Sequence, residues 1–144
     1  MDHQEAVQII NRVPTIQEYQ QLCQSVGWGE IINFDAAAKG LPQSVFGVVA
    51  ETGEGETVGM GRVVGDGAMY FYLQDIAVDP DYQGRGIGTR LVVAMMDFLR
   101  ENAAPQSFIA LFSVPDALAF YERFSFKERD MVGVFTVREL IEGI

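Results

Sequence analysis

The chain contains very little cysteine and histidine. Among its 144 residues, one is a cysteine, Cys23, and one is a histidine, His3. A single thiol makes neither a disulfide within the chain nor a cysteine-based metal site. One histidine in a polar N-terminal stretch also leaves a histidine-based zinc site and a Ser-His-Asp triad without the residues they need. The sequence therefore predicts a protein with no metal site and no internal disulfide.

Long apolar runs and positive charges are also scarce. No run approaches the length of about 20 apolar residues that spans a membrane, and the start, Met1–Glu5, is polar and unlike a signal peptide. Lys and Arg together number 10, against 20 Asp and Glu, so the net charge is -10. Because such a protein repels nucleic-acid phosphates, we expect a cytoplasmic protein with no nucleic-acid or membrane partner. The acidity either favours a cationic substrate, such as an amine, or serves solubility alone.

The rest of the composition is typical of one globular domain. Apolar residues make up 49% of the chain, and we expect a single domain over residues 1–144. Thr15 and Glu18 form a capping-box pattern at a helix start. Periodicity and turn residues predict helices at 15–26, 33–39, 86–102 and 115–124, and strands at 7–13, 44–50, 57–64, 68–78, 107–112, 126–127 and 132–138.

The predicted elements indicate a mixed α/β fold. Strands 44–50, 57–64 and 68–78 are separated by short turns, which favours an antiparallel meander. Strand 68–78, helix 86–102 and strand 107–112 then form a parallel pair joined by a crossover helix. We therefore expect a mostly antiparallel sheet flanked by helices.

A glycine-rich loop, Gln83-Gly84-Arg85-Gly86-Ile87-Gly88, lies between a predicted strand and a predicted buried helix. Glycine lets a ligand approach the backbone closely, and the first N–H groups of a helix have no internal partner. Such a loop binds a pyrophosphate at the positive end of the helix, helped here by Arg85 and Arg90. The loop is neither a Walker A motif nor a dinucleotide fingerprint, because the spacing differs. A structural turn without a ligand stays open as an alternative.

The loop resembles the signature of the GCN5-related N-acetyltransferase (GNAT) superfamily, Gln/Arg-x-x-Gly-x-Gly/Ala. Upstream, Ile76-Ala77-Val78-Asp79-Pro80 is similar to the context found in that family, and Ala117-Leu118-Ala119-Phe120-Tyr121 resembles its second block at the right separation. Two features depart from the family: Val114 replaces a common asparagine, and Phe124-Ser125-Phe126 replaces Leu-Gly-Phe.

The resemblance implies an acyl-CoA N-acyltransferase fold and a site for acetyl-CoA. In that fold the two parallel central strands splay apart, and the thioester lies between them. The implied cofactor-binding residues fall on the strand end and the loop: Ile76, Ala77, Val78, Gln83, Gly84, Arg85, Gly86, Ile87, Gly88 and Thr89.

The resemblance also implies the reaction, which is direct transfer of an acetyl group to an amine without a covalent intermediate. Tyr121 matches the tyrosine that protonates the leaving thiolate, whose pKa is lower than that of a phenol. The family's base positions hold Tyr72 and Gln74, which are poor bases, so deprotonation goes through water that they contact or the amine arrives neutral. Alternation places Asp75 on the opposite strand face unless a bulge turns it, and favours an ion pair with Arg62 over a role as base.

The identity of the acceptor is left open by the sequence. Trp28, Phe34 and Phe46 are candidate walls for a small-molecule amine, or are core residues. The alternatives to a small-molecule N-acetyltransferase are an acyl-CoA-binding module without catalysis and a protein or peptide N-acetyltransferase. A homodimer is also expected, because similar proteins pair through C-terminal strands and residues 132–137 form an apolar edge candidate.

Overall fold

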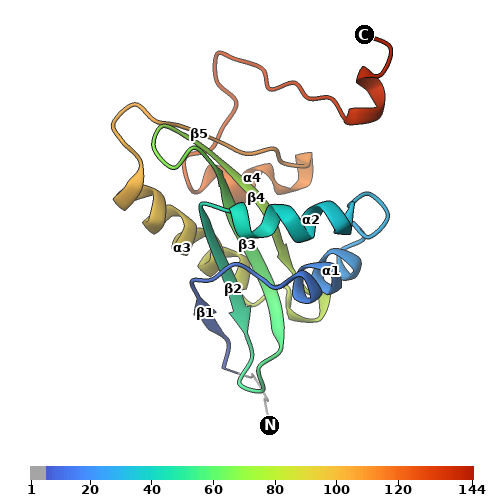
Figure 1. Ribbon diagram of the computed structural model, residues 1–144. Coiled ribbons are helices and arrows are strands. Elements are labelled where there is room, and N and C mark those ends of the chain that lie inside the picture. The colour runs from blue at the N-terminus through green and yellow to red at the C-terminus, as the bar shows by residue number, and fades with distance from the viewer. Residues whose placement is uncertain (1–5) are drawn as a thin grey trace. The chain divides into compact units, whose positions relative to one another are not determined.

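The computed structural model describes residues 6–144, so His3 and the N-terminal stretch Met1–Glu5 lie outside the described residues. The chain forms two compact units, one up to Ile109 and one from Ala110 onward. Figure 1 shows the elements of both units in chain order. The first unit contains the glycine-rich loop and most of the predicted site.

A five-stranded sheet is formed by residues 6–144, with the strands in sequence order from β1 to β5. The first four strands pair antiparallel, and β5 runs parallel to β4. The meander and the mostly antiparallel sheet predicted from the sequence are therefore confirmed. The strands are β1 (Gln8–Ile10), β2 (Phe46–Glu51), β3 (Thr57–Gly65), β4 (Tyr70–Val78) and β5 (Phe108–Ala110).

Helices cover both faces of this sheet (Figure 1). On one face lies α3 (Ile87–Asn102), which approaches closely because β3 carries glycines there: a Cβ at Gly61 would stand 2.8 Å from the sulfur of Met95. On the other face lie α1 (Ile16–Ser25) and α2 (Phe34–Gly40). The core under α1 and α2 consists of Tyr19, Leu22, Cys23, Leu41, Val49, Met60 and Ala77.

Two of the predicted helix starts, those of α1 and α2, are confirmed by their side-chain caps. The Thr15 hydroxyl accepts a hydrogen bond from the Glu18 backbone N–H at 3.2 Å, and the Glu18 carboxylate accepts one from the Thr15 N–H at 2.7 Å. This reciprocal pair satisfies two N–H groups that a helix end leaves without partners. At α2, the Asn33 side chain accepts from the Ala36 N–H at 3.0 Å.

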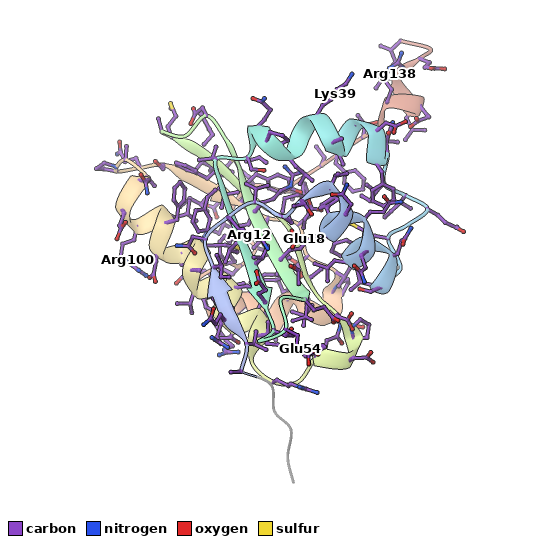
Figure 2. All side chains as sticks on the ribbon, turned by 60° about the horizontal axis from the view of Figure 1, so that its bottom comes forward. Arg12, Glu18, Lys39, Glu54, Arg100 and Arg138 are labelled. Carbon is purple, nitrogen blue, oxygen red and sulfur yellow. The ribbon has the colours of Figure 1, made fainter. Side chains whose placement is uncertain are left out.

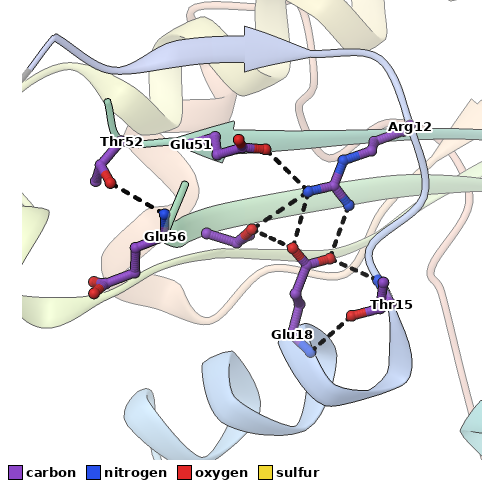
Figure 3. Close-up of polar contacts among 7 residues, drawn as sticks. Arg12, Thr15, Glu18, Glu51, Thr52 and Glu56 are labelled. Carbon is purple, nitrogen blue, oxygen red and sulfur yellow. Dashed lines mark hydrogen bonds and ion pairs between the residues drawn. The ribbon is translucent and has the colours of Figure 1, made fainter. Parts of the chain in front are cut away.

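An ion-pair cluster joins α1 to the sheet (Figure 3). The Arg12 guanidinium donates to both carboxylate oxygens of Glu18, at 2.8 and 2.9 Å, and to Glu51 of β2 at 3.1 Å. The Thr57 hydroxyl of β3 also donates to Glu18. Figure 2 places Arg12 and Glu18 side by side where α1 meets the sheet. The cluster therefore ties one helix end to two strands.

The second unit contains short helical segments: η3 (Pro115–Ala117), α4 (Leu118–Glu122) and η4 (Arg138–Ile141). The helix predicted at 115–124 is thus confirmed in two pieces. The strands predicted at 126–127 and 132–138 are wrong, since the described chain forms no strand there. A strand needs a neighbouring backbone to pair with, and an apolar pattern alone does not supply one. Val132, Val134 and Phe135 are instead largely exposed.

We predict that Glu18→Ala lowers the free energy of unfolding by about 2 kcal/mol, because it removes the cap partner and both charge-assisted bonds to Arg12. Hydrogen bonding to Arg12 lowers the pKa of Glu18 from 4.5 to about 2. The stabilisation is therefore complete above about pH 4.5 and is lost as the pH falls toward 2. Urea unfolding across this pH range measures both effects.

Glu54→Ala is the matched control, because Glu54 is exposed in the turn between β2 and β3. We expect it to leave the free energy of unfolding within about 0.5 kcal/mol of wild type. Equal free energies of unfolding for Glu18→Ala and Glu54→Ala would contradict the conclusion that the Arg12 cluster stabilises the contact between α1 and the sheet.

Candidate functional site

A β-bulge interrupts β4 where the candidate site begins. Met60 pairs with Ala77 and Arg62 pairs with Gln74, so that Asp75 and Ile76 of β4 both oppose the single residue Gly61. Asp75 has φ of 59°, in the left-handed region. A non-glycine residue there costs about 1 kcal/mol or more, although aspartate tolerates it better than most. Backbone strain is therefore stored at the centre of this strand.

The bulge changes which side chains share a face. Directly opposed residues of an antiparallel pair lie on one face, so Gln74 lies with Arg62, and Ala77 lies with Met60, toward α1. The carboxylate of Asp75 also reaches Arg62 on that face. The exception stated with the prediction applies: alternation alone would set Asp75 opposite Tyr72 and Gln74, but the bulge turns its carboxylate to the face of Arg62. Ile76 turns instead toward α3.

The predicted ion pair between Arg62 and Asp75 is confirmed. The Arg62 Nε donates to the Asp75 Oδ2 at 2.7 Å, and Arg62 Nη1 donates to the Ser44 hydroxyl at 3.2 Å. Two side chains of α1, Tyr19 and Cys23, are buried beside this pair. Burial, followed by the negative charge of Asp75, raises the pKa of Tyr19, and burial raises the pKa of Cys23 to about 11. Both groups are therefore neutral at physiological pH.

Tyr72 and Gln74 are the predicted base positions, and they lie on the α1 face together with this pair. Burial and the nearby charge of Asp75 raise the pKa of Tyr72 above its usual value near 10. The phenol therefore stays protonated near neutral pH and does not act as a base. This agrees with the expectation that neither side chain abstracts a proton directly.

The structure separates the three aromatic residues proposed as substrate walls. Trp28 and Phe34 pack, partly buried, against the core cluster on the α1 face, and the Phe34 ring meets Tyr19 edge-on at 6.2 Å. Phe46 lies on the opposite face, where its ring stacks on Phe98 of α3 at 4.6 Å. Trp28 and Phe34 therefore share a sheet face with Tyr72 and Gln74, and Phe46 does not.

The glycine-rich loop follows β4 after Asp79 and the short 3-10 helix η2 (Pro80–Tyr82). The Gln83 side-chain amide donates to the Val78 carbonyl at 2.9 Å, which ties the loop to the strand end. Gly84 and Gly86 both have φ of 79°, and beyond their immediate chain neighbours no described atom lies within 4 Å of a Cβ built on either. Backbone conformation, rather than crowding, is therefore what requires glycine at these two positions.

The start of α3 leaves backbone N–H groups open to a ligand. Its N-cap is Gly86, and within residues 6–144 no side chain caps this helix end. The first intrahelical bond runs from the Arg90 N–H to the Gly86 carbonyl at 3.1 Å. The N–H groups of Ile87 and Gly88 precede it and therefore have no acceptor one turn back in the helix, at its positive end. This arrangement is suited to a bound phosphate.

Two arginines are fixed near this helix start. The Arg85 guanidinium stacks over the Tyr82 ring, 4.9 Å from its centroid, and donates to the Asp81 carbonyl at 3.2 Å. Arg90 donates to the Val7 carbonyl at 2.9 Å. They add local positive charge to a protein whose net charge is -10. An anion is therefore attracted here by nearby groups rather than by the overall field.

The end of β4 extends beyond β5. The Phe108 N–H donates to the Met69 carbonyl at 2.8 Å, so β5 begins beside the start of β4. Since β5 is three residues long, it ends beside the first half of β4. The segment Ile76–Val78, predicted to bind the cofactor through its backbone, lies past that point and is paired on its other side with β3.

Tyr121 lies on α4 in the second unit. Its ring meets that of Phe120 edge-on at 5.0 Å, and burial raises the pKa of its phenol. The phenol therefore keeps its proton at neutral pH, as a donor must. Nearby, Ser125 takes φ of 72° where the family commonly has glycine, so the turn keeps the left-handed conformation without the glycine. Val114 precedes η3 as its N-cap, and its apolar side chain offers the helix no hydrogen bond.

Sequence reasoning missed Tyr19 as a neighbour of the site. It lies on the apolar face of α1, where its spacing is typical of a core residue, and its proximity to Asp75 follows from the packing of α1 on the sheet. No group of three or more metal-ligating side chains is found among residues 6–144. Within the same residues, no helix combines the length and apolar character that crossing a membrane requires.

Known proteins match both this sequence and this fold. The family model described as acetyltransferase (GNAT) domain matches residues 43–128. An uncharacterized N-acetyltransferase of Pyropia yezoensis is 30% identical over 129 residues, covering 87% of this chain and 73% of that protein. A protein of unknown function from methicillin-resistant Staphylococcus aureus, described as a probable acetyltransferase, superposes with a TM-score of 0.83 at 30% identity, over 92% of this chain and 99% of that one.

A second solved structure agrees with these matches. A GNAT-family acetyltransferase from Streptococcus pneumoniae superposes with a TM-score of 0.78 at 25% identity, over 92% of this chain and 98% of that one. The matched region contains β4, the glycine-rich loop and α3, which are the elements that form the candidate site. The chain therefore belongs to the GNAT family of N-acetyltransferases, as the glycine loop and the second block predict.

Proposed function

We propose that this protein transfers an acetyl group from acetyl-CoA to a primary amine of a small molecule. The observation that carries the proposal is the start of α3, which no side chain of residues 6–144 caps and where Gly84 and Gly86 turn the chain after β4 and η2. Family membership supplies the reaction class, and this geometry supports a bound pyrophosphate.

The cofactor lies along β4 and the loop in this proposal. The backbone N–H groups of Ile87 and Gly88 bind the pyrophosphate, and Arg85 and Arg90 add charge beside it. The pantetheine arm pairs with the backbone of Ile76–Val78, which β5 does not reach. The full set of proposed cofactor contacts is Ile76, Ala77, Val78 and the seven loop and helix residues from Gln83 to Thr89.

The reaction is a direct attack. The amine nitrogen forms a bond to the thioester carbonyl carbon, the C–S bond breaks, and the leaving thiolate takes a proton from the Tyr121 phenol. The Tyr121 phenol is protonated at neutral pH, as a donor must be, and burial raises its pKa further, so its strength as a donor depends on how the thiolate is positioned against it. Tyr72 and Gln74 contact water that accepts the proton of the amine. Asp75 is not assigned as the base, because Arg62 already binds its carboxylate.

We also propose that Trp28 and Phe34 form walls of the acceptor site. They share the α1 face with Tyr72 and Gln74, whereas the stacking of Phe46 on Phe98 favours a packing role for Phe46. Aromatic walls in an acidic protein suit an amine that carries an apolar or aromatic group.

A homodimer and a cytoplasmic location stay predictions. The exposed apolar side chains Val132, Val134 and Phe135 support a contact with a second copy of the chain.

We predict that wild-type protein binds acetyl-CoA in titration calorimetry and that the double variant Gly86→Asp, Gly88→Asp does not. The new carboxylates repel the pyrophosphate, and side chains at position 86 also oppose its left-handed conformation. Circular dichroism confirms that each protein is folded. A folded wild type that binds no acetyl-CoA would contradict the proposed function.

We predict that Tyr121→Phe lowers kcat by about a hundredfold or more while the KM for acetyl-CoA changes little, because the proton donor for the thiolate is lost. The measurement is a thiol-release assay over a panel of small amines. Tyr70→Phe is the matched control, since Tyr70 is exposed at the start of β4, and it keeps wild-type kcat.

The panel also separates the alternative functions. Binding of acetyl-CoA without turnover on any amine or peptide would favour a module without catalysis. Turnover on a peptide panel alone would favour a protein or peptide N-acetyltransferase.

A further inference from the structure

The ion pair between Arg62 and Asp75 lies at the bulge of β4, directly before the strand end that the proposed function assigns to the cofactor. The bond between Arg62 Nε and Asp75 Oδ2 is 2.7 Å long and joins β3 to β4 at the point where their register shifts. The two side chains are 18% and 5% exposed, so water solvates neither of them fully. Breaking the pair would leave a nearly buried charge without its partner.

The residue at the bulge is one that the backbone disfavours. Glycine adopts the left-handed conformation freely, whereas Asp75, at φ of 59°, adopts it at a cost in conformational free energy. The carboxylate compensates by binding Arg62, and the Ser44 hydroxyl fixes Arg62 in turn at 3.2 Å. An outlier held in this way by its surroundings is typical of a functional site.

The bulge also sets the direction of the residues that follow it. Because Asp75 and Ile76 together oppose Gly61, Ile76 turns toward α3, and Ala77 returns to the α1 face opposite Met60. The backbone N–H and C=O groups of Ile76–Val78 are oriented accordingly. A strand without the bulge would present these groups one residue out of phase.

We propose that Arg62 is a positioning residue for acyl-CoA binding: by holding Asp75 in the left-handed conformation, it fixes the bulge and so orients the backbone of Ile76–Val78 toward the pantetheine arm. The inference rests on the proposed function. It assigns to Arg62 no contact with the cofactor and no proton transfer.

The test is the Kd of acetyl-CoA, measured by titration calorimetry well below the melting temperature of each variant. We expect Arg62→Gln to raise the Kd about tenfold or more, because a small misplacement of binding groups weakens binding strongly. Asparagine also tolerates the left-handed conformation, so Asp75→Asn removes only the charge, and we expect a similar rise in the Kd of acetyl-CoA. Arg62→Lys keeps the charge and partly restores binding.

Arg12→Gln is the matched control. It breaks an ion-pair cluster that joins α1 to β2 and β3 and does not involve β4. We expect this variant to lower the melting temperature and leave the Kd unchanged. A role limited to general stability would instead give the same Kd for Arg62→Gln and Arg12→Gln.

The outcomes separate this inference from the proposed function. Wild type that binds no acetyl-CoA would contradict both the proposed function and the positioning role. Wild type that binds, with folded Arg62→Gln binding equally well, would overturn the positioning role alone. If Arg62→Gln does not fold, the nearly isosteric Asp75→Asn decides, and an unchanged Kd for that variant overturns the inference.

Discussion

The backbone N–H groups at the start of α3 are the constraint on which the rest of the site depends. They lie at the positive end of a 16-residue helix in a protein of net charge -10. They therefore attract an anion that the overall negative charge of the protein repels. Two features set the position of these N–H groups: Gly84 and Gly86 take left-handed conformations, and the Gln83 side chain ties the loop to Val78. Strand, loop and helix thus form one continuous unit whose geometry is suited to a bound phosphate.

Two ion-pair systems support this unit from different positions. The Arg12 cluster joins α1 to β2 and β3, and the Arg62–Asp75 pair joins β3 to β4 at the bulge. The first secures the helix that covers the α1 face, where Trp28 and Phe34 lie. The second lies within the strand that leads to the loop. The two systems therefore involve separate groups of residues in the first unit.

The sequence predicted what local interactions determine. The capping box at Thr15, the meander and the glycine loop each depend on neighbours in the chain, and the structure contains all three. The bulge at Asp75 was not predictable from alternation, because the extra residue follows from pairing with Gly61. The same holds for Tyr19 and for Phe46, whose neighbours come from packing across the sheet. The strands predicted at 126–127 and 132–138 failed because a strand needs a partner that no local pattern supplies.

The most direct test of the central claim is an NMR titration of ¹⁵N-labelled protein with coenzyme A. The account predicts that the largest amide shift changes occur at Gly86, Ile87 and Gly88, followed by Ile76–Val78, while the turn between β2 and β3 is unaffected. Saturable shifts confined to other residues, or no shifts at millimolar coenzyme A, would contradict the claim that the start of α3 binds the pyrophosphate.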